Sequence, residues 1–234
     1  MQSGDLSGWN DMRCTLKWLI PGVILLASGL AQAQEPIAWK IRDLIQSPQP
    51  IIELRDQRDR VIRKLDVRQL VYIYAVMSAI EEAAEITGEL YIVAGDAPNA
   101  FAGAGRSGEN IYGLNFGMLD LIGDDVHAAA AILGHEMAHL KLNHAEDARR
   151  AQKRSSGSVF SAADTRYSRD NERDADYLGM IWTIEAGYDP AGAVRVHEKL
   201  YKLSKTRGAS FVGSHPSSIE RITVLKSLAR RMAQ

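Results

Sequence analysis

The sequence is poor in features on which several protein classes depend. It has one cysteine in 234 residues, Cys14, which lies in an N-terminal segment that we expect to be removed. The remaining chain then has no thiol, which excludes disulfides and cysteine chemistry and leaves histidine and carboxylate ligands for any zinc ion. The 28 basic and 29 acidic residues nearly balance, so the charge gives no indication of a nucleic-acid partner.

Long apolar runs are also scarce. The first 33 residues have the parts of a signal peptide: basic residues, a broken apolar run and a small-residue cleavage site (Arg13 and Lys17; Trp18 to Leu30, interrupted by Pro21-Gly22; Ala31-Gln-Ala33). Because this run is short for a membrane span, we expect residues 1–33 to be a signal peptide for export, most simply to a bacterial periplasm. A start at Met12 would make residues 1–11 an upstream extension. The alternative is an uncleaved N-terminal anchor, with the protein facing the periplasm and associated with the membrane surface.

Residues 34–234 are enough for a single domain with a core of its own. Helices are expected over 67–87, from Asp124 or Asp125 to about Ala151, from about Ser168 to before Gly187, from Asp189-Pro190 to about Leu203, and from Ser214-His215-Pro216 onward. Short strands are expected at 90–93, 99–102 and 110–115, a solvated helix face over Arg55 to Lys64, and a loop over 153–165. This order predicts an α+β fold dominated by helices, with a small sheet beside the long helix that begins near Asp125.

One glycine-rich segment resembles a nucleotide-binding loop. Gly103-Ala-Gly105-Arg-Ser-Gly108 has the glycine spacing of that loop. In a dinucleotide-binding protein, however, the glycines lead from a strand into a helix, whose N-terminus holds the pyrophosphate. A strand-like segment follows here instead. We interpret these glycines as a hairpin loop and expect no nucleotide.

The most informative motif is His135-Glu136-x-x-His139. Two histidines four residues apart lie on one face of a helix, where both imidazoles can bind one zinc ion, and the glutamate can act on a water at that ion. The alternative is a helix that carries two unrelated histidines. The apolar run Ala128 to Leu133 directly before the motif predicts the buried helix that the metal-binding interpretation requires.

A catalytic zinc ion needs a third protein ligand and an open position for water. His144 lies nine residues after His135, about half a turn away from its face on a continuous helix, so we expect a surface histidine there. Glu172 is the better candidate. It lies on the next long helix four residues before Asp176, which can accept a hydrogen bond from a ligand imidazole and fix its orientation. An ordinary charged helix start is the alternative.

These motifs resemble those of the gluzincin endopeptidases of the CAAX prenyl protease and HtpX type. Segments that match in order are H-E-x-x-H, E-x-x-A-D at 172–176, Asn99-Ala-Phe-Ala102, Ala186-Gly-Tyr-Asp-Pro190 and His215-Pro-x-x-x-x-Arg221. The similarity covers about Leu90 to Leu228. It implies the exported, soluble branch of the family, because the chain lacks the transmembrane helices of the integral-membrane members.

The resemblance implies a zinc-dependent endopeptidase with one zinc ion per chain. Its site residues would be the metal ligands His135, His139 and Glu172, the base Glu136, the orienting Asp176, and a substrate-binding edge strand at Asn99, Ala100 and Phe101. His215 is the candidate donor to the developing oxyanion, with Arg221 packed nearby, although a histidine that only caps the last helix is the alternative. His127 and His197 have no such context and are interpreted as structural.

An edge strand that pairs with an extended chain suits unfolded polypeptides. We therefore expect the substrates to be unfolded or misassembled envelope proteins, a role that rests on the resemblance. The competing hypothesis is a zinc-binding chaperone or scaffold that holds unfolded chains without cutting them. Glu136 favours the enzyme, since a protein without proteolytic activity has no need of the base. The sequence gives no indication of the oligomeric state.

Overall fold

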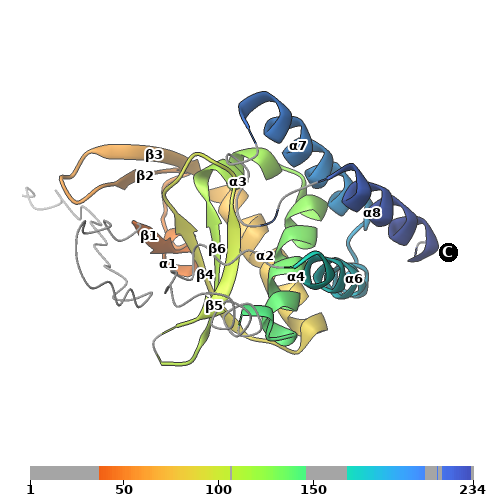
Figure 1. Cartoon of the computed structure of the whole chain (residues 1–234). Coiled ribbons are helices and arrows are strands. Elements are labelled where there is room, and N and C mark those ends of the chain that lie inside the picture. The colour runs from red at the N-terminus through yellow and green to blue at the C-terminus, as the bar shows by residue number, and fades with distance from the viewer. Residues whose placement is uncertain (1–36, 106, 146–167, 209–214, 216–217, 233–234) are drawn as a thin grey trace, which may run out of the picture.

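The computed structural model describes residues 37–105, 107–145, 168–208, 215 and 218–232, and Figure 1 shows their arrangement. The expected signal peptide over 1–33 and the expected loop over 153–165 lie outside these residues. The described part is an α+β structure dominated by helices, as the sequence predicts. Among the described residues, no helix combines the length and the apolar character needed to cross a membrane.

The main sheet has four strands. These are β1 (Ala38–Lys40), β4 (Gly88–Val93), β6 (Asn110–Asn115) and β5 (Ala100–Ala104), in that spatial order. The pair β4 and β6 is parallel, and the other two pairs are antiparallel. Helices α2, α4 and α6 lie on one side of this sheet (Figure 1). The three strands expected from the sequence are confirmed, and β5 lies at an edge of the sheet.

The glycine-rich segment around Gly105 connects the antiparallel strands β5 and β6, so its interpretation as a hairpin loop is confirmed. The N–H of Gly105 donates to the carbonyl of Glu109 at 2.7 Å, and Gly108 has a φ of 85°, a left-handed conformation that glycine adopts without a steric penalty. Because the chain continues directly into a strand, this loop has no helix N-terminus that could hold a pyrophosphate.

The first long helix is α2 (Val67–Ala84), and the side chain of Asp66 caps it by accepting the N–H of Arg68 at 2.8 Å. Its buried face includes Leu70, Ile73, Met77 and Ile80, all 2% exposed or less. Val71, whose apolar side chain would favour a buried position, is 43% exposed. The helix ends before the expected residue 87, because Glu85 takes a left-handed φ of 51°.

The charged stretch between Arg55 and Lys64 is not a helix, which corrects the sequence-based prediction. It forms the hairpin of β2 (Ile51–Arg55) and β3 (Val61–Asp66). The carboxylate of Asp56 accepts the backbone N–H groups of Arg58 and Arg60 at 2.9 and 3.0 Å, which closes the turn. In a strand only alternate side chains face the core, and these two strands are short. Their other face is charged, so the alternation of apolar and polar residues is hard to recognise in the sequence.

The remaining long helices surround the expected motif. They are α4 (Val126–Lys141), α6 (Arg169–Glu185), α7 (Ala191–Arg207) and α8 (Ile219–Met232). Two further described helices, α1 (Ile41–Leu44) and α3 (Phe116–Ile122), are short. The side chain of Asp125 caps α4 by accepting the N–H of Ala128 at 3.1 Å, and Ser168 caps α6 in the same way through Asn171. Helix α4 contacts α2, α6, α7 and the strands β5 and β6, which makes it the central element of the domain.

Two helix boundaries differ from the expected ones. Helix α4 ends at Lys141 and not near Ala151, because Asn143 takes a left-handed φ of 55° that α-helix geometry does not allow. Helix α8 begins at Ile219, and the hydroxyl of Ser218 accepts the N–H of Arg221 at 3.1 Å. Ser218 is therefore the cap, and the prediction that His215 lies at the N-cap of the last helix is wrong.

Candidate metal centre

Helix α4 supplies the histidines of the H-E-x-x-H motif. His135, Glu136 and His139 are 4%, 2% and 2% exposed, since the helix runs through the interior of the domain. Burial lowers the pKa of His139 to about 3, so its imidazole is neutral at pH 7. A neutral imidazole has the free lone pair that metal binding requires.

Two glycines bring α4 and α6 unusually close together. A Cβ on Gly134 would lie 2.7 Å from the carbonyl oxygen of Gly179, and a Cβ on Gly179 would lie 2.6 Å from the backbone nitrogen of His135. The two backbones therefore touch where any larger residue would separate them. Asp176 and Glu172 lie about one and two turns before Gly179 on α6, so this crossing sets them beside the histidines of α4.

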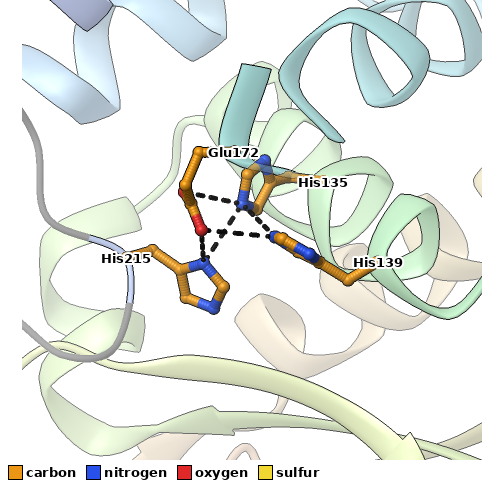
Figure 2. A group of neighbouring side chains, drawn as sticks. All are labelled: His135, His139, Glu172 and His215. Atoms are coloured by element: carbon orange, nitrogen blue, oxygen red, sulfur yellow. Dashed lines mark hydrogen bonds and ion pairs between the residues drawn. The ribbon is translucent and has the colours of Figure 1, made fainter. Parts of the chain in front are cut away.

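Four side chains converge at this crossing. His135, His139, Glu172 and His215 each offer a ligand atom, and these atoms all lie within 4.8 Å of one another. The Nε2 atoms of His135 and His139 are 3.0 Å apart, and the Nδ1 of His215 is 2.8 Å from an oxygen of Glu172 (Figure 2). Three imidazoles and a carboxylate without cysteine are a donor set that suits zinc, so the chemistry of the cluster fits this ion.

A buried ion pair supports the cluster from behind. Arg221 donates two hydrogen bonds to Asp176, at 2.7 and 2.6 Å, and its Nη1 lies 2.5 Å from Glu172. The other partner of Asp176 is the Nδ1 of His135 at 3.0 Å. Burial alone would raise the pKa of Asp176, but the charge of Arg221 and the hydrogen bond to His135 outweigh it and keep the pKa below its usual range. Asp176 is thus a carboxylate that orients His135, and Arg221 compensates its charge.

His144 is not a surface histidine, which corrects the expectation from the sequence. It is 5% exposed, and its Nδ1 lies 2.9 Å from the Nδ1 of His139. The expectation assumed a continuous helix, but the left-handed turn at Asn143 directs the chain back toward the end of α4. An asparagine after the last apolar residues is a known helix-stop signal, and it could have revealed this contact.

His215 reaches the cluster from the segment before α8. Its Nδ1 lies 3.3 Å from the Nε2 of His135, and its Nε2 lies 3.5 Å from a carboxylate oxygen of Glu136. One ring nitrogen therefore faces the ligand atoms while the other faces the expected base. The second oxygen of Glu136, Oε2, is buried and has no hydrogen-bond partner among the described residues.

The other two histidines lie outside the cluster. The Nδ1 of His127 accepts the backbone N–H of Asp189 at 3.0 Å, which ties the start of α4 to the start of α7. His197 on α7 is buried, and burial lowers its pKa to about 3. Neither offers a ligand atom to the cluster.

A narrow cleft opens beside the cluster, between the edge strand β5 and helix α7. Asn99 and Ala100 form part of its wall together with Glu136 and His215. Phe101, the third residue expected to bind substrate, does not line the cleft. Its ring covers Gly113 of the neighbouring strand, on the face of the sheet that carries Tyr91. The side chain of Phe101 therefore lies away from the cleft.

Comparison with known proteins agrees with these features. The model of peptidase family M48 matches residues 66–163 and 148–229, which together include every residue of the cluster. The chain belongs to peptidase family M48. Within the matched residues of this M48 chain, H-E-x-x-H lies on α4 and Glu172 lies on α6.

Three curated metalloproteases are similar to this M48 chain over part of their length. The mitochondrial metalloendopeptidase OMA1 of Arabidopsis thaliana is 41% identical over 25% of the chain and 12% of its own length. Metalloprotease LoiP of Escherichia coli strain K12 is 28% identical over 45% of the chain and 50% of its own length. OMA1 of Schizosaccharomyces pombe is 27% identical over 62% of the chain and 47% of its own length. The chain thus spans half the length or less of these relatives.

Proposed function

We propose that this M48 chain is a zinc-dependent endopeptidase of the CAAX prenyl protease and HtpX type, with His135, His139 and Glu172 as the metal ligands. The observation that carries the proposal is the convergence of these ligand atoms, together with one from His215, within 4.8 Å of one another. The names of its relatives, all metalloproteases, support the same activity. Zinc bound there would polarise a peptide carbonyl and lower the pKa of a water molecule.

Glu136 would act as the base. Its Oε2 is buried and has no hydrogen-bond partner among the described residues, so this oxygen can accept a proton from the attacking water. Glu136 would then donate that proton to the leaving amine. The same carboxylate serves as base and then as acid, so the residue ends each turnover in its starting state.

Asp176, Arg221 and His144 would position the ligands. Asp176 accepts from the Nδ1 of His135, and His144 faces the Nδ1 of His139, so each imidazole has a fixed orientation with its Nε2 toward the cluster. Arg221 holds both Asp176 and Glu172, which couples the last helix to the ligand set.

His215 has two candidate roles that differ in their consequences. As a donor to the oxyanion it would stabilise the transition state, which is the role inferred from the sequence. As a fourth ligand it would close the position that water or substrate needs. The 2.8 Å approach of its Nδ1 to Glu172, inside the ligand cluster, favours the second role in the resting protein.

The substrates we propose are unfolded or misassembled envelope proteins. The edge position of β5 supports this proposal, because an extended chain can pair with an edge strand whatever its sequence. The signal-like residues 1–33 support the proposal that the protein is exported, with an N-terminal anchor or membrane-surface association as the alternative. We propose that residues 34–234 form a single domain.

A direct experiment measures cleavage of an unfolded test protein by the purified chain. Cleavage should disappear when a chelator removes the metal and return on addition of one equivalent of zinc. If the zinc-loaded protein binds the test protein and prevents its aggregation without cutting it, the chaperone or scaffold hypothesis is correct and the protease hypothesis fails.

A further inference from the structure

We propose that Asn115 is a positioning residue that holds the first residues of the edge strand β5 in place for pairing with a substrate chain. This inference rests on the proposed function and assigns a further residue to it. Asn115 lies at the end of β6 and does not itself line the cleft beside Glu136. It acts through Asn99 and Ala100, which form part of the cleft wall.

The side chain of Asn115 makes three hydrogen bonds to backbone groups. Its Oδ1 accepts the N–H of Asn99 and the N–H of Met118, each at 2.9 Å. Its Nδ2 donates to the carbonyl of Ala97 at 2.6 Å. These partners use both ends of the amide, and they join the residues just before β5 to the first turn of α3.

Backbone contacts hold the same segment. The N–H of Gly117 donates to the carbonyl of Gly95 at 2.9 Å, and a Cβ on Gly117 would collide with the carbonyl group of Asp96. The chain before β5 therefore packs directly on the start of α3. Because α3 belongs to the densely packed core, where its Leu119 is fully buried, these contacts connect the edge strand to a fixed support.

Asn115 also completes the hydrogen bonding between β5 and β6. The two strands are antiparallel, with Ala100 opposite Leu114, so Asn99 lies opposite Asn115. The backbone N–H of Asn115 donates to the carbonyl of Asn99 at 3.1 Å, and the side chain of Asn115 accepts the N–H of Asn99 in return. Removal of the side chain would break one of these two bonds, at the end of the strand that lies in the cleft.

This pair determines which backbone groups of β5 face the open edge. In an antiparallel ladder alternate residues bond to the neighbouring strand, so Asn99 faces β6 while Ala100 and Ala102 present their backbone groups at the edge. Ala100 lies in the cleft beside Glu136, and its N–H and carbonyl are therefore the groups that a substrate would meet nearest to the base. The narrow cleft must widen to admit a chain, and the side-chain bonds described above keep β5 in register with β6 while it does.

The variant Asn115→Ser separates this role from helix capping. A serine hydroxyl can still accept the N–H of Met118 as an N-cap, but it is too short to reach Asn99 and Ala97 as well. Pairing along the edge strand contributes equally to the bound substrate and to the transition state, so its loss acts on KM. We expect KM for unfolded, fluorescein-labelled casein to rise about tenfold, with kcat within about twofold of the wild type and an unchanged zinc content.

The variant Asn110→Ser is the matched control. Asn110 lies at the other end of β6, outside the cleft, and its side chain donates to the carbonyl of Thr87 at 2.9 Å. This variant also shortens an asparagine that bonds to the backbone, and its KM should equal that of the wild type. An unchanged KM in Asn115→Ser, or a fall in kcat alone, would show that Asn115 supports only the fold and would overturn its positioning role.

Two further readouts do not depend on cleavage. In the zinc-loaded Glu136→Gln variant, addition of Asn115→Ser should weaken binding of the labelled casein about tenfold and accelerate amide hydrogen exchange in residues 97–102. Addition of Asn110→Ser should change neither, and binding and exchange that Asn115→Ser also leaves unchanged would contradict the role. Failure of the proposed function looks different, because the zinc-loaded wild type then cuts no casein, and the substrate role of Asn115 falls with it.

Discussion

The imidazoles of His139 and His144 meet edge to face, with 2.9 Å between their Nδ1 atoms. At this distance one nitrogen carries a proton and the other accepts it. If His139 binds zinc through Nε2, its Nδ1 carries the proton and His144 is the acceptor. His144 then fixes both the tautomer and the ring orientation of a metal ligand.

Replacement of His144 should weaken the metal site without removing a ligand. We expect His144→Ala to lower zinc affinity about ten- to a hundredfold, because the loss of such an orienting partner has effects of this size. Competition with a coloured chelator measures the affinity. His127→Ala is the matched control, since His127 lies outside the cluster, and its affinity should equal that of the wild type. Equal affinities in both variants would show that the His144 contact does not support the metal.

The contact between Gly134 and Gly179 should be intolerant of a methyl group. Gly179→Ala places a Cβ 2.6 Å from the backbone of His135, so α6 must move away from α4 and carry Glu172 with it. We expect a loss of about 1–3 kcal/mol in the free energy of unfolding, measured with urea, together with weaker zinc binding. Gly103→Ala is the control, because a Cβ there has no neighbour within 4 Å. Unchanged zinc affinity in Gly179→Ala would contradict the positioning role of the crossing.

The two roles of His215 predict opposite results for His215→Ala. If His215 is a fourth ligand in the resting protein, its removal opens a position on the metal and activity should rise. If it only stabilises the oxyanion, kcat should fall while KM and zinc content stay the same. Steady-state kinetics and metal analysis on one preparation separate the two. Unchanged kinetics would exclude both roles.

The ion pair between Asp125 and Arg195 should make stability depend on pH. Arg195 donates to both oxygens of Asp125, at 2.7 and 2.9 Å, and these hydrogen bonds lower the pKa of Asp125 to about 2. A carboxylate with a lowered pKa stabilises the folded state above its unfolded pKa, and the contribution is lost as the pH falls from about 4 toward 2.

Asp125→Asn keeps a capping side chain but removes the charge, so it should reduce the free energy of unfolding by about 1 kcal/mol at pH 7. The difference from the wild type should shrink as the pH falls below about 4. Urea titrations at several pH values measure it, with Asp174→Asn as the control, because Asp174 is exposed on α6. A difference that stays constant down to pH 3 would show that the Arg195 pair does not shift this pKa.

Much of the fold is predictable from local signals. Asp66, Asp125 and Ser168 mark helix starts that the structure confirms, because a cap is a local interaction between a side chain and a backbone N–H two or three residues away. The hairpin over β2 and β3 was missed for the opposite reason. Its core contacts are made by few residues, and the charged exposed face dominates its composition.

The site likewise contains residues that local patterns predict and contacts that they do not. His135, Glu136, His139 and Glu172 follow from spacing, because each pair lies on one helix or on two helices that must pack together. The contact of His144 depends on a left-handed turn at Asn143, and the cleft beside Glu136 is lined by residues from several elements. Such features are set by tertiary packing, which no local pattern records.

The most direct test of the account replaces Glu136 by glutamine in the zinc-loaded chain. The variant keeps the size of the side chain and removes the base, and Glu136 is not in the ligand cluster. We predict one zinc ion per chain, an unchanged unfolding curve, and a fall in cleavage of an unfolded protein by at least about a hundredfold. Loss of the zinc, or cleavage at the wild-type rate, would contradict the assignment of Glu136 as the base.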